Sequence, residues 1–331
     1  MGSRLAMGSR VAFILATAVA CLAQPAGAQT YPDRPVRIVV PTGPGGATDI
    51  VTRVVAEKVQ ASLGQPVVVE NKPGANGNVG AAYVLSQPAD GYTLMMGHIG
   101  LMTINAHFYK DMKFDPLQEF APVIRATTYA NALVVTNSLP IHSTRDLVEH
   151  AKKSSTGLKF SSAGVGGSLH MGFELLKVEA GFEAQHIPYT ATAKALLSVI
   201  SGETDALFAD VLAAIPHMSS RSLRGIAISS KQRSRLLPDL PAVAESGIPA
   251  LANFDVVGWN GLVVKTGTPA DRIKLINEHV RRALESPDMA ERMSKLGADV
   301  AVMSPEEFGA FMRAEDKKWG DLVKKADLKV N

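Results

Sequence analysis

Glycines gather at one predicted strand-to-helix junction, in the stretch VVPTGPGGATD over residues 39–49. Residues 35–40 form a β-branched, apolar run that predicts a buried strand, and apolar residues at helical spacing follow the glycines. Thr48 or Asp49 suits the N-cap of that helix, and Gly64 suits its end. The glycines therefore precede a helix N-terminus, where backbone N–H groups lack partners and the dipole is positive. Such a turn favours an anion.

The spacing within this turn favours a carboxylate over a phosphate. The chain has no G-x-x-x-x-G-K-[ST] phosphate loop, and GPGGAT lacks the G-x-G-x-x-G order of a dinucleotide fold. The turn also brings no lysine, whereas N–H groups and hydroxyls alone can hold a carboxylate. From the residues by themselves, the alternative stays open that the glycines serve only a tight turn.

A second stretch, FSSAGVGGSLH over residues 160–170, repeats the order of strand, glycines, hydroxyls and helix. Ligands of open α/β sheets bind beyond the carboxyl ends of the strands. Two such turns in two facing domains would hold a ligand from both ends. The alternative is two unrelated tight turns, and the match in form favours the shared site.

The surrounding elements alternate between strand and helix, which predicts an α/β fold with mainly parallel sheets flanked by helices. The C-terminal third is predicted to be helical. The predicted strands cover residues 35–40, 66–71, 92–97, 132–136, 158–164, 184–189, 204–210 and 223–229. The predicted helices include residues 144–153, 168–177, 191–201, 269–285, 287–296 and 305–326.

The N-terminus is predicted to be a secretory signal peptide over residues 1–28. Two arginines precede the apolar run at 11–23, and the small residues AGA at 26–28 predict cleavage after Ala28. The apolar run is too short for a confident membrane span. Cys21 is the only cysteine, and a lipid anchor on it is the alternative to a soluble exported protein. The predicted compartment is the periplasm.

Size and charge narrow the class of protein further. The chain has 331 residues and a formal net charge of +3, with acidic and basic residues interspersed. That length is too large for one small core and predicts two domains. A basic run with interleaved aromatic residues is absent from the sequence, so nucleic acid is not an expected partner.

Catalytic and metal-binding motifs are not found in the sequence. The G-x-S-x-G nucleophile elbow is absent. Ser161 and Ser162 follow a predicted strand, but His170 falls inside the next helix and is poorly placed as their general base. The histidines show no H-x-H, H-E-x-x-H or Cys/His grouping, so neither a metal nor a cofactor is expected. A secreted hydrolase remains only as the alternative to a binding protein.

Several phrases of the sequence together resemble those of a known family. They occur in the order YPDRPVRIVVPTGPGGATD, GQPVVVENKPGANGNVGA, PADGYTL, FSSAGVGGSLH, HIPY and LPDLPAVAESG. This order is typical of the Bug family, the periplasmic solute-binding proteins of tripartite tricarboxylate transporters, which are related to the TctC-type citrate binders. The resemblance covers essentially the whole mature chain.

The resemblance implies a two-domain, Venus-flytrap periplasmic-binding-protein fold that closes over its ligand. The first domain is expected at residues 31–127 plus 255–331, and the second at 128–254. The implied ligand is a small organic carboxylate, held largely by backbone N–H groups, hydroxyls and water. The implied partners are the membrane subunits of a tripartite transporter, and the protein is expected to be a monomer and not an enzyme. A periplasmic ligand sensor is the alternative to an uptake receptor.

The resemblance also implies which residues contact the ligand. They belong to the glycine turns and to the ends of neighbouring strands. The expected ligand-binding residues are Thr42, Gly43, Gly45, Gly46, Thr48, Asp49, His98, Ser162, Gly166, Ser168, His170, Tyr189, Thr190 and Asp210.

Four of these residues allow a second interpretation. His98 could contact the ligand or lie on the rim of the site, and Asp49 could cap its helix instead of touching the ligand. His170 is expected to orient the second glycine turn. Asp210 is unusual beside an anion, and it could accept a hydrogen bond from a hydroxyl or ammonium group or face away.

Overall fold

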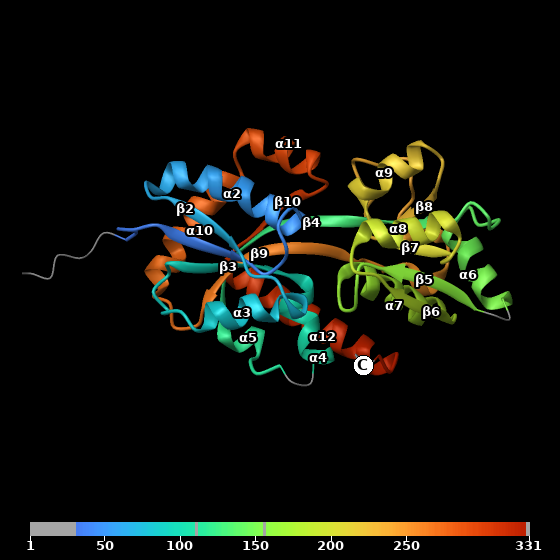
Figure 1. The fold of residues 1–331 in the computed structure, drawn as a ribbon, viewed down its shortest axis with the longest axis horizontal. Helices are drawn as coiled ribbons and strands as arrows, with labels where there is room; N and C mark the ends of the chain where they lie inside the picture. The colour runs from blue at the N-terminus through green and yellow to red at the C-terminus, as the bar shows by residue number, and fades with distance from the viewer. Residues whose placement is uncertain (1–30, 110–111, 155–156, 329–331) are drawn as a thin grey trace, which may run out of the picture. The chain divides into compact units, whose positions relative to one another are not determined.

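A single mixed sheet organises the computed structural model, which describes residues 31–109, 112–154 and 157–328. The chain divides into two units, Met1–Arg34 and Pro35–Asn331, and the elements below belong to the second. Within it, ten strands form the sheet, in the order β2-β1-β3-β9-β4-β7-β5-β6, while β8 and β10 also pair with β4 (Figure 1). The predicted signal peptide and Cys21 lie outside the described residues.

The strands are short except for the two in the middle of the sheet. They are β1 (Val36–Val40), β2 (Val67–Asn71), β3 (Thr93–His98), β4 (Phe120–Val135), β5 (Leu158–Ser162), β6 (Ala184–Pro188), β7 (Ala206–Asp210), β8 (Arg224–Ile228), β9 (Val257–Lys265) and β10 (Asp299–Met303).

The helices flank this sheet. They are α2 (Ala47–Leu63), α3 (Asn78–Leu85), α4 (Asn105–Phe108), α5 (Pro116–Glu119), α6 (Thr144–Lys153), α7 (Ser168–Ala180), α8 (Thr192–Ser201), α9 (Val211–Ser219), α10 (Ala270–Leu284), α11 (Pro287–Lys295) and α12 (Pro305–Lys325). A π-helix at Gly100–Ile104 follows β3 directly.

Strand direction changes in the middle of the sheet. The β2–β1–β3 end and the β7–β5–β6 end are parallel, as expected for strands joined through helices. The long strand β4 is antiparallel to β9 over most of its length and to β7 over its last residues, and β9 is also antiparallel to β3. Thus β4 and β9 connect the two ends of the sheet (Figure 1). The predicted α/β fold with helices flanking the sheet is confirmed.

The predicted boundaries fail where polar residues interrupt apolar runs. The strand expected at 132–136 is only the last part of β4, which begins at Phe120. The elements α9, β9 and β10 were not predicted. The predicted N-cap of the first helix, Thr48 or Asp49, is wrong as well. The N-cap of α2 is Gly46, which has extended backbone angles and no side-chain cap. Thr48 and Asp49 lie inside the first turn, and the carboxylate of Asp49 reaches back to the turn instead.

Apolar burial holds the helices on the sheet. In α2, Val51, Val55 and Val59 lie at helical spacing and are at most 4% exposed. Each such side chain contributes about 1.5–3 kcal/mol when fully buried. Trp259 of β9 is fully buried and makes an edge-to-face contact with Phe308 of α12. Among the described residues, no helix is long and apolar enough to cross a membrane.

Candidate functional site

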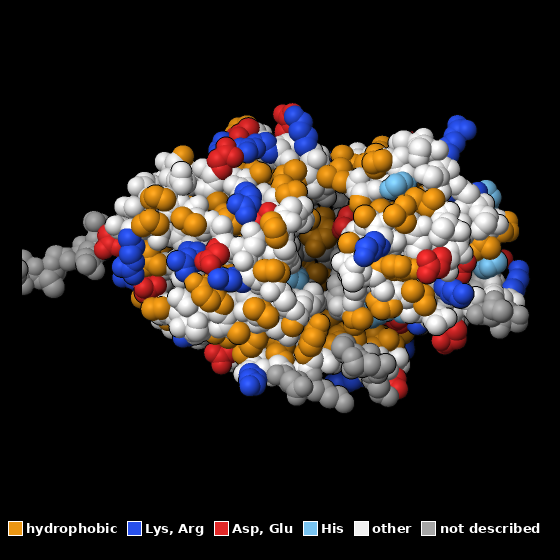
Figure 2. All heavy atoms as spheres, viewed as in Figure 1, with side chains coloured by type: hydrophobic (Ala, Val, Ile, Leu, Met, Phe, Trp, Pro, Cys, Tyr) orange, Lys and Arg blue, Asp and Glu red, His pale blue; other side chains and the backbone are white. Residues whose placement is uncertain are grey.

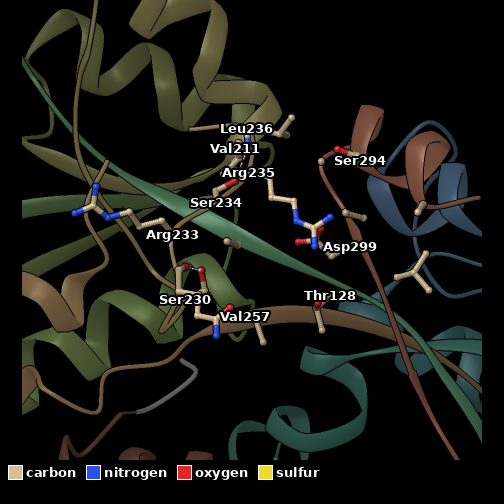
Figure 3. Close-up of a pocket in the computed structure, with 16 residues that line it drawn as sticks. Thr128, Val211, Ser230, Arg233, Ser234, Arg235, Leu236, Val257, Ser294 and Asp299 are labelled. Carbon is tan, nitrogen blue, oxygen red and sulfur yellow. Dashed lines mark hydrogen bonds between the residues drawn. The ribbon is translucent and has the colours of Figure 1, made fainter. Parts of the chain in front are cut away.

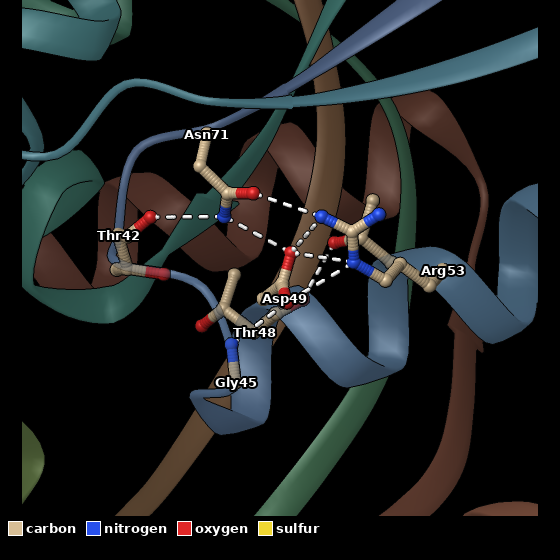
Figure 4. A network of polar contacts seen from close by, with 7 residues as sticks. Thr42, Gly45, Thr48, Asp49, Arg53 and Asn71 are labelled. Carbon is tan, nitrogen blue, oxygen red and sulfur yellow. Dashed lines mark hydrogen bonds and ion pairs between the residues drawn. The ribbon is translucent and has the colours of Figure 1, made fainter.

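The first glycine turn, residues 42–49, presents backbone to solvent and is held from behind by Asp49. Residues 43–47 are exposed, whereas Asp49 is only 3% exposed. The Asp49 carboxylate accepts hydrogen bonds from the Gly45 N–H at 2.9 Å and from Asn71 Nδ2 at 2.9 Å, and it pairs with Arg53 at 3.0 Å (Figure 4). Both oxygens are therefore engaged within the protein, and the carboxylate fixes the shape of the turn.

These contacts also keep Asp49 ionised. Burial alone raises the pKa of a carboxyl group, but the hydrogen bonds from Arg53, Gly45 and Asn71 outweigh it, so that the pKa of Asp49 lies below its usual value. Asn71 Nδ2 also donates to the Thr42 carbonyl at 3.1 Å, which joins the start of the turn to its end. The asparagine of the VENKPG phrase thus supports the turn.

The second glycine turn, residues 161–170, is supported by histidines. The Gly166 N–H donates to His170 Nδ1 at 3.3 Å, and the Ser162 hydroxyl lies 2.7 Å from His186 Nε2. The His170 and His186 rings stack with centroids 4.0 Å apart. Burial lowers the pKa of His170 well below its usual value, so the ring is neutral. Its position behind the turn fits the expected orienting role.

The second glycine turn meets the segment that follows β3. A Cβ atom added to Gly100 would lie 3.0 Å from the carbonyl oxygen of Gly166 and 2.8 Å from Asn76 Nδ2. Asn76 Nδ2 donates to Asn105 Oδ1 at 2.8 Å, and Asn105 Nδ2 donates to the Asn78 side chain at 2.8 Å. This asparagine network holds the segment of the chain against which the second glycine turn packs.

Polar side chains lie in register across three neighbouring strands between the turns. His98 of β3 is opposite Asn260 of β9, and Asn260 is opposite Thr127 of β4. All three are at most 8% exposed. His98 Nε2, Asn260 Oδ1 and Thr127 Oγ1 are buried without a hydrogen-bond partner, while Asn260 Nδ2 donates to Thr48 Oγ1 at 3.1 Å. Buried polar atoms normally have partners, so these atoms indicate a place for a ligand or water.

The protonation of His98 makes it a neutral donor. Burial lowers the pKa of His98 to about 4, and its Nδ1 accepts the Leu101 N–H at 3.4 Å. The single ring proton therefore lies on Nε2, the buried atom without a partner. A neutral N–H donor can bind an anion without bringing a counter-charge.

Tyr129 and Asn131 continue this polar surface along β4. The Tyr129 ring covers Gly258, where an added Cβ would lie 2.0 Å from the ring, and its hydroxyl is within hydrogen-bonding reach of Ser168. Burial raises the pKa of Tyr129, which keeps the phenol protonated. Asn131 is fully buried, and both polar atoms of its side chain lack a partner.

A cavity of about 280 Å³ opens beside these residues. The first glycine turn contributes Gly45, β4 contributes Tyr129, and Asp210 lies at the end of β7. Ile50 and Leu212, two of the exposed large apolar residues, also line it. Figure 2 shows a hollow with hydrophobic side chains between the surface over α2 and the surface over α8 and α9. The cavity therefore combines polar groups with an apolar wall.

A larger cavity, of about 440 Å³, lies on the side of β4 that faces α11 and β10 (Figure 3). Its arginines are exposed, and Arg233 forms an ion pair with Glu245 at 2.9 Å. Arg235 extends towards Asp299 across the cavity (Figure 3). Neither glycine turn lines this cavity, so it is a weaker candidate for the binding site.

The predicted site residues fall into two groups. Tyr189 and Thr190 differ from the rest, because the Tyr189 ring packs with α8 and faces a separate cavity lined by Lys194 and Leu197. Thr190 is exposed. The others lie along the turns and the strand ends beside them: Thr42, Gly43, Gly45, Gly46, Thr48, Asp49, His98, Ser162, Gly166, Ser168, His170 and Asp210.

Sequence reasoning missed the polar residues of the central strands. Thr127, Tyr129, Asn131 and Asn260 were not predicted, although ATTYANALVV places polar residues at alternate positions of a strand. That alternation indicates one polar face. The sequence alone does not reveal that Thr127, Asn131 and Asn260 are fully buried.

The fold is that of the periplasmic solute-binding proteins, as predicted. Residues 51–328 match the family described as the tripartite tricarboxylate transporter family receptor, TctC. The chain belongs to this family, and the resemblance to Bug and TctC proteins is confirmed. The family consists of solute receptors rather than enzymes.

Individual relatives are similar over nearly their whole length. The protein BugT of Bordetella pertussis is 31% identical over 314 residues, which cover 95% of this chain and 95% of BugT. The structure of R. palustris Rpa4515 with adipate has a TM-score of 0.79 and 30% identity, covering 90% of this chain and 99% of that one. MatC from Rhodopseudomonas palustris with bound malate has a TM-score of 0.74 and 28% identity, covering 88% and 100%.

Proposed function

We propose that this protein is a periplasmic solute-binding protein that captures a small organic anion with one or more carboxylates. The binding site is the space between the first and second glycine turns, above the polar row of β3, β9 and β4. The structural relatives that hold adipate and malate support a carboxylate as the ligand.

The observation that carries this proposal is the set of buried neutral atoms without partners. His98 Nε2 is a neutral donor, and Thr127 Oγ1 is a hydroxyl that can donate to a carboxylate oxygen. When a carboxylate binds, hydrogen bonds from these donors replace the hydrogen bonds that its oxygens made to water. A buried donor left without a partner costs about 1–3 kcal/mol. Backbone N–H groups at the start of α2 add favourable dipoles.

We further propose that the ligand draws two domains together. The predicted domains, residues 31–127 plus 255–331 and 128–254, would meet within β4 and just before β9. A ligand that contacts both domains stabilises the closed arrangement only through contacts it lacks in the open one. The two glycine turns, one from each predicted domain, supply such contacts.

Export and delivery complete the proposal. The signal peptide predicted at residues 1–28 would direct the protein to the periplasm, where it would pass its ligand to the membrane subunits of a tripartite transporter. N-terminal sequencing of secreted protein should give Gln29 as the first residue. A start at Cys21 with an attached lipid would contradict the soluble form.

A thermal-shift screen of monocarboxylates, dicarboxylates, tricarboxylates and aromatic acids tests the ligand class. A ligand at about 100 times its dissociation constant stabilises the folded state by about 2.7 kcal/mol. Sugars and amines of similar size serve as controls. Stabilisation by these controls and by no carboxylate would overturn the proposal, and calorimetric titration of each hit gives its affinity.

A further inference from the structure

Asn131 is the buried polar residue whose situation the carboxylate alone does not explain. Its side chain is fully buried, and both Oδ1 and Nδ2 lack a partner. Its backbone is fixed on both sides by Ser229, whose hydroxyl accepts the Asn131 N–H at 2.9 Å and whose N–H donates to the Asn131 carbonyl at 2.8 Å. The amide is therefore held in place with its hydrogen-bonding capacity unused.

Asp210 is the direct neighbour of Asn131 on the adjacent strand. The two residues are opposite each other in the antiparallel pairing of β4 with β7. Side chains of opposite residues leave an antiparallel sheet on the same face, and their Cβ atoms lie about 4.5–5.5 Å apart. Nevertheless, the amide of Asn131 does not bond to the carboxylate. The two groups are thus available to a third group.

The groups around Asp210 leave its charge without a cationic partner. Thr192 Oγ1 donates to Asp210 Oδ2 at 3.2 Å, and the ionisable group facing it from β4 is the neutral phenol of Tyr129. Within the described ranges, the lining of the cavity that contains Asp210 includes no Lys or Arg. Burial raises the pKa of Asp210. A carboxylate in this place repels an anion unless a hydrogen-bond donor lies between them.

We propose that Asn131 and Asp210 form a specificity subsite that selects carboxylates bearing a hydroxyl or ammonium group on the carbon chain. This inference rests on the proposed function and adds to it the chemical class of the ligand. The donor group gives its hydrogen bond to Asp210, and the same group or a ligand oxygen bonds to the Asn131 amide. An unsubstituted chain leaves both side chains unpaired, and sites built to bond such a group discriminate strongly against analogues lacking it.

Two matched triplets of diacids test the inference by calorimetric titration. One triplet is succinate, malate and aspartate, and the other is adipate, 2-hydroxyadipate and 2-aminoadipate. We expect a substituted member of at least one triplet to bind at least tenfold more tightly than its parent. If the parent acids bind as tightly as their derivatives, the inference is overturned while the proposed function stands. If no carboxylate binds in these triplets or in the wider screen, both are overturned.

Variants then locate the discrimination. Asn131→Ala should reduce the ratio between derivative and parent to about two or less, because the derivative loses more affinity than the parent. Asn137→Ala is the matched control, since Asn137 is an exposed asparagine just beyond β4 whose Nδ2 donates to the Arg221 carbonyl. It should leave the ratio unchanged. An unchanged ratio in Asn131→Ala would overturn the role of this residue.

Asp210→Asn separates the two kinds of donor. The neutral amide still accepts a hydrogen bond from a hydroxyl but loses its charge attraction for an ammonium group. We therefore expect a greater loss of affinity for an amino acid than for a hydroxy acid. Equal affinities of wild type and Asp210→Asn for both derivatives would show that the donor is bound elsewhere and would overturn the inference. Circular dichroism and the melting temperature confirm that each variant folds.

Discussion

Gly100 and Gly166 approach so closely that a methyl group on Gly100 would lie 3.0 Å from the Gly166 carbonyl oxygen. Gly100 begins the π-helix after β3, and Gly166 belongs to the second glycine turn. Gly166 also has a positive φ of 82°, which side chains other than glycine rarely adopt. The approach therefore needs glycine at position 100 for space and at position 166 for its backbone angle.

Gly100→Ala should therefore weaken ligand binding by about tenfold or more. The added methyl would also lie 2.8 Å from Asn76 Nδ2, and such overpacking costs about 1–3 kcal/mol. Calorimetric titration gives the affinity, and urea unfolding gives the stability. Gly309→Ala in α12, away from both turns, is the control and should retain wild-type affinity. Wild-type affinity in Gly100→Ala would mean that this approach is not needed for binding.

Gly46→Val tests whether the ligand lies against the first glycine turn. Gly46 has a φ of −78°, and a Cβ atom there would meet only the Gly43 carbonyl oxygen, at 3.6 Å. The protein itself can accommodate a Cβ at this position, so a branched side chain mainly fills space outside it. We expect binding to be abolished and the melting temperature to stay close to that of the wild type. Retained affinity in the folded variant would exclude this turn from the binding site.

Asp49→Ala should weaken both folding and binding. The substitution removes the acceptor of the Gly45 N–H and the partner of Arg53, and loss of a comparable helix-terminal aspartate costs about 0.5–2 kcal/mol. Asp146→Ala is the control, because Asp146 lies in the first turn of α6 and accepts the His142 N–H at 2.9 Å. Both variants should lose stability, whereas only Asp49→Ala should lose affinity. If the Asp49→Ala and Asp146→Ala variants bind the ligand with equal affinity, Asp49 does not position the first glycine turn for binding.

His98 should make the protein sensitive to acid. Burial lowers its pKa from 6.5 to about 4 in the folded state, so between these values the unfolded state binds the extra proton. Its contribution to the free energy of unfolding is complete above pH 6.5 and declines as the pH falls towards 4. His98→Gln should reduce the loss of stability between pH 7 and pH 4.5 by about 2–3 kcal/mol. The control is His142→Gln, an exposed histidine. An unchanged pH profile in His98→Gln would contradict the buried neutral ring.

Salt should have little effect on affinity. The donors proposed for the ligand are neutral side chains and backbone N–H groups, and buried contacts are weakly screened. Between about 50 and 500 mM NaCl we expect the dissociation constant of a carboxylate without an ammonium group to change by less than about twofold. Titrations at constant pH measure this dependence. A decrease in affinity of tenfold or more over that range would indicate an ion pair with the ligand.

The sequence alone determined the alternating α/β order and the two glycine turns. These features depend on residues that are close together in the sequence. Hydrophobic periodicity, helix-capping residues and turn residues therefore predict them from short stretches of the chain. The helices predicted at 144–153 and 287–296 correspond closely to α6 and α11. Local patterns failed at β4, whose first part carries alternating polar residues, and at β9, which was not predicted.

The tertiary structure alone decided which polar groups share the candidate site. His98, Thr127 and Asn260 are far apart in the sequence and become neighbours only through the register of β3, β9 and β4. Burial at this junction lowers the pKa of His98 and leaves Asn131 without partners. A side chain becomes buried when segments far away in the sequence pack over it and exclude water. Local sequence patterns contain no information about those distant segments. The same packing brings Asn71 to the carboxylate of Asp49, which also accepts the Gly45 N–H of the first glycine turn.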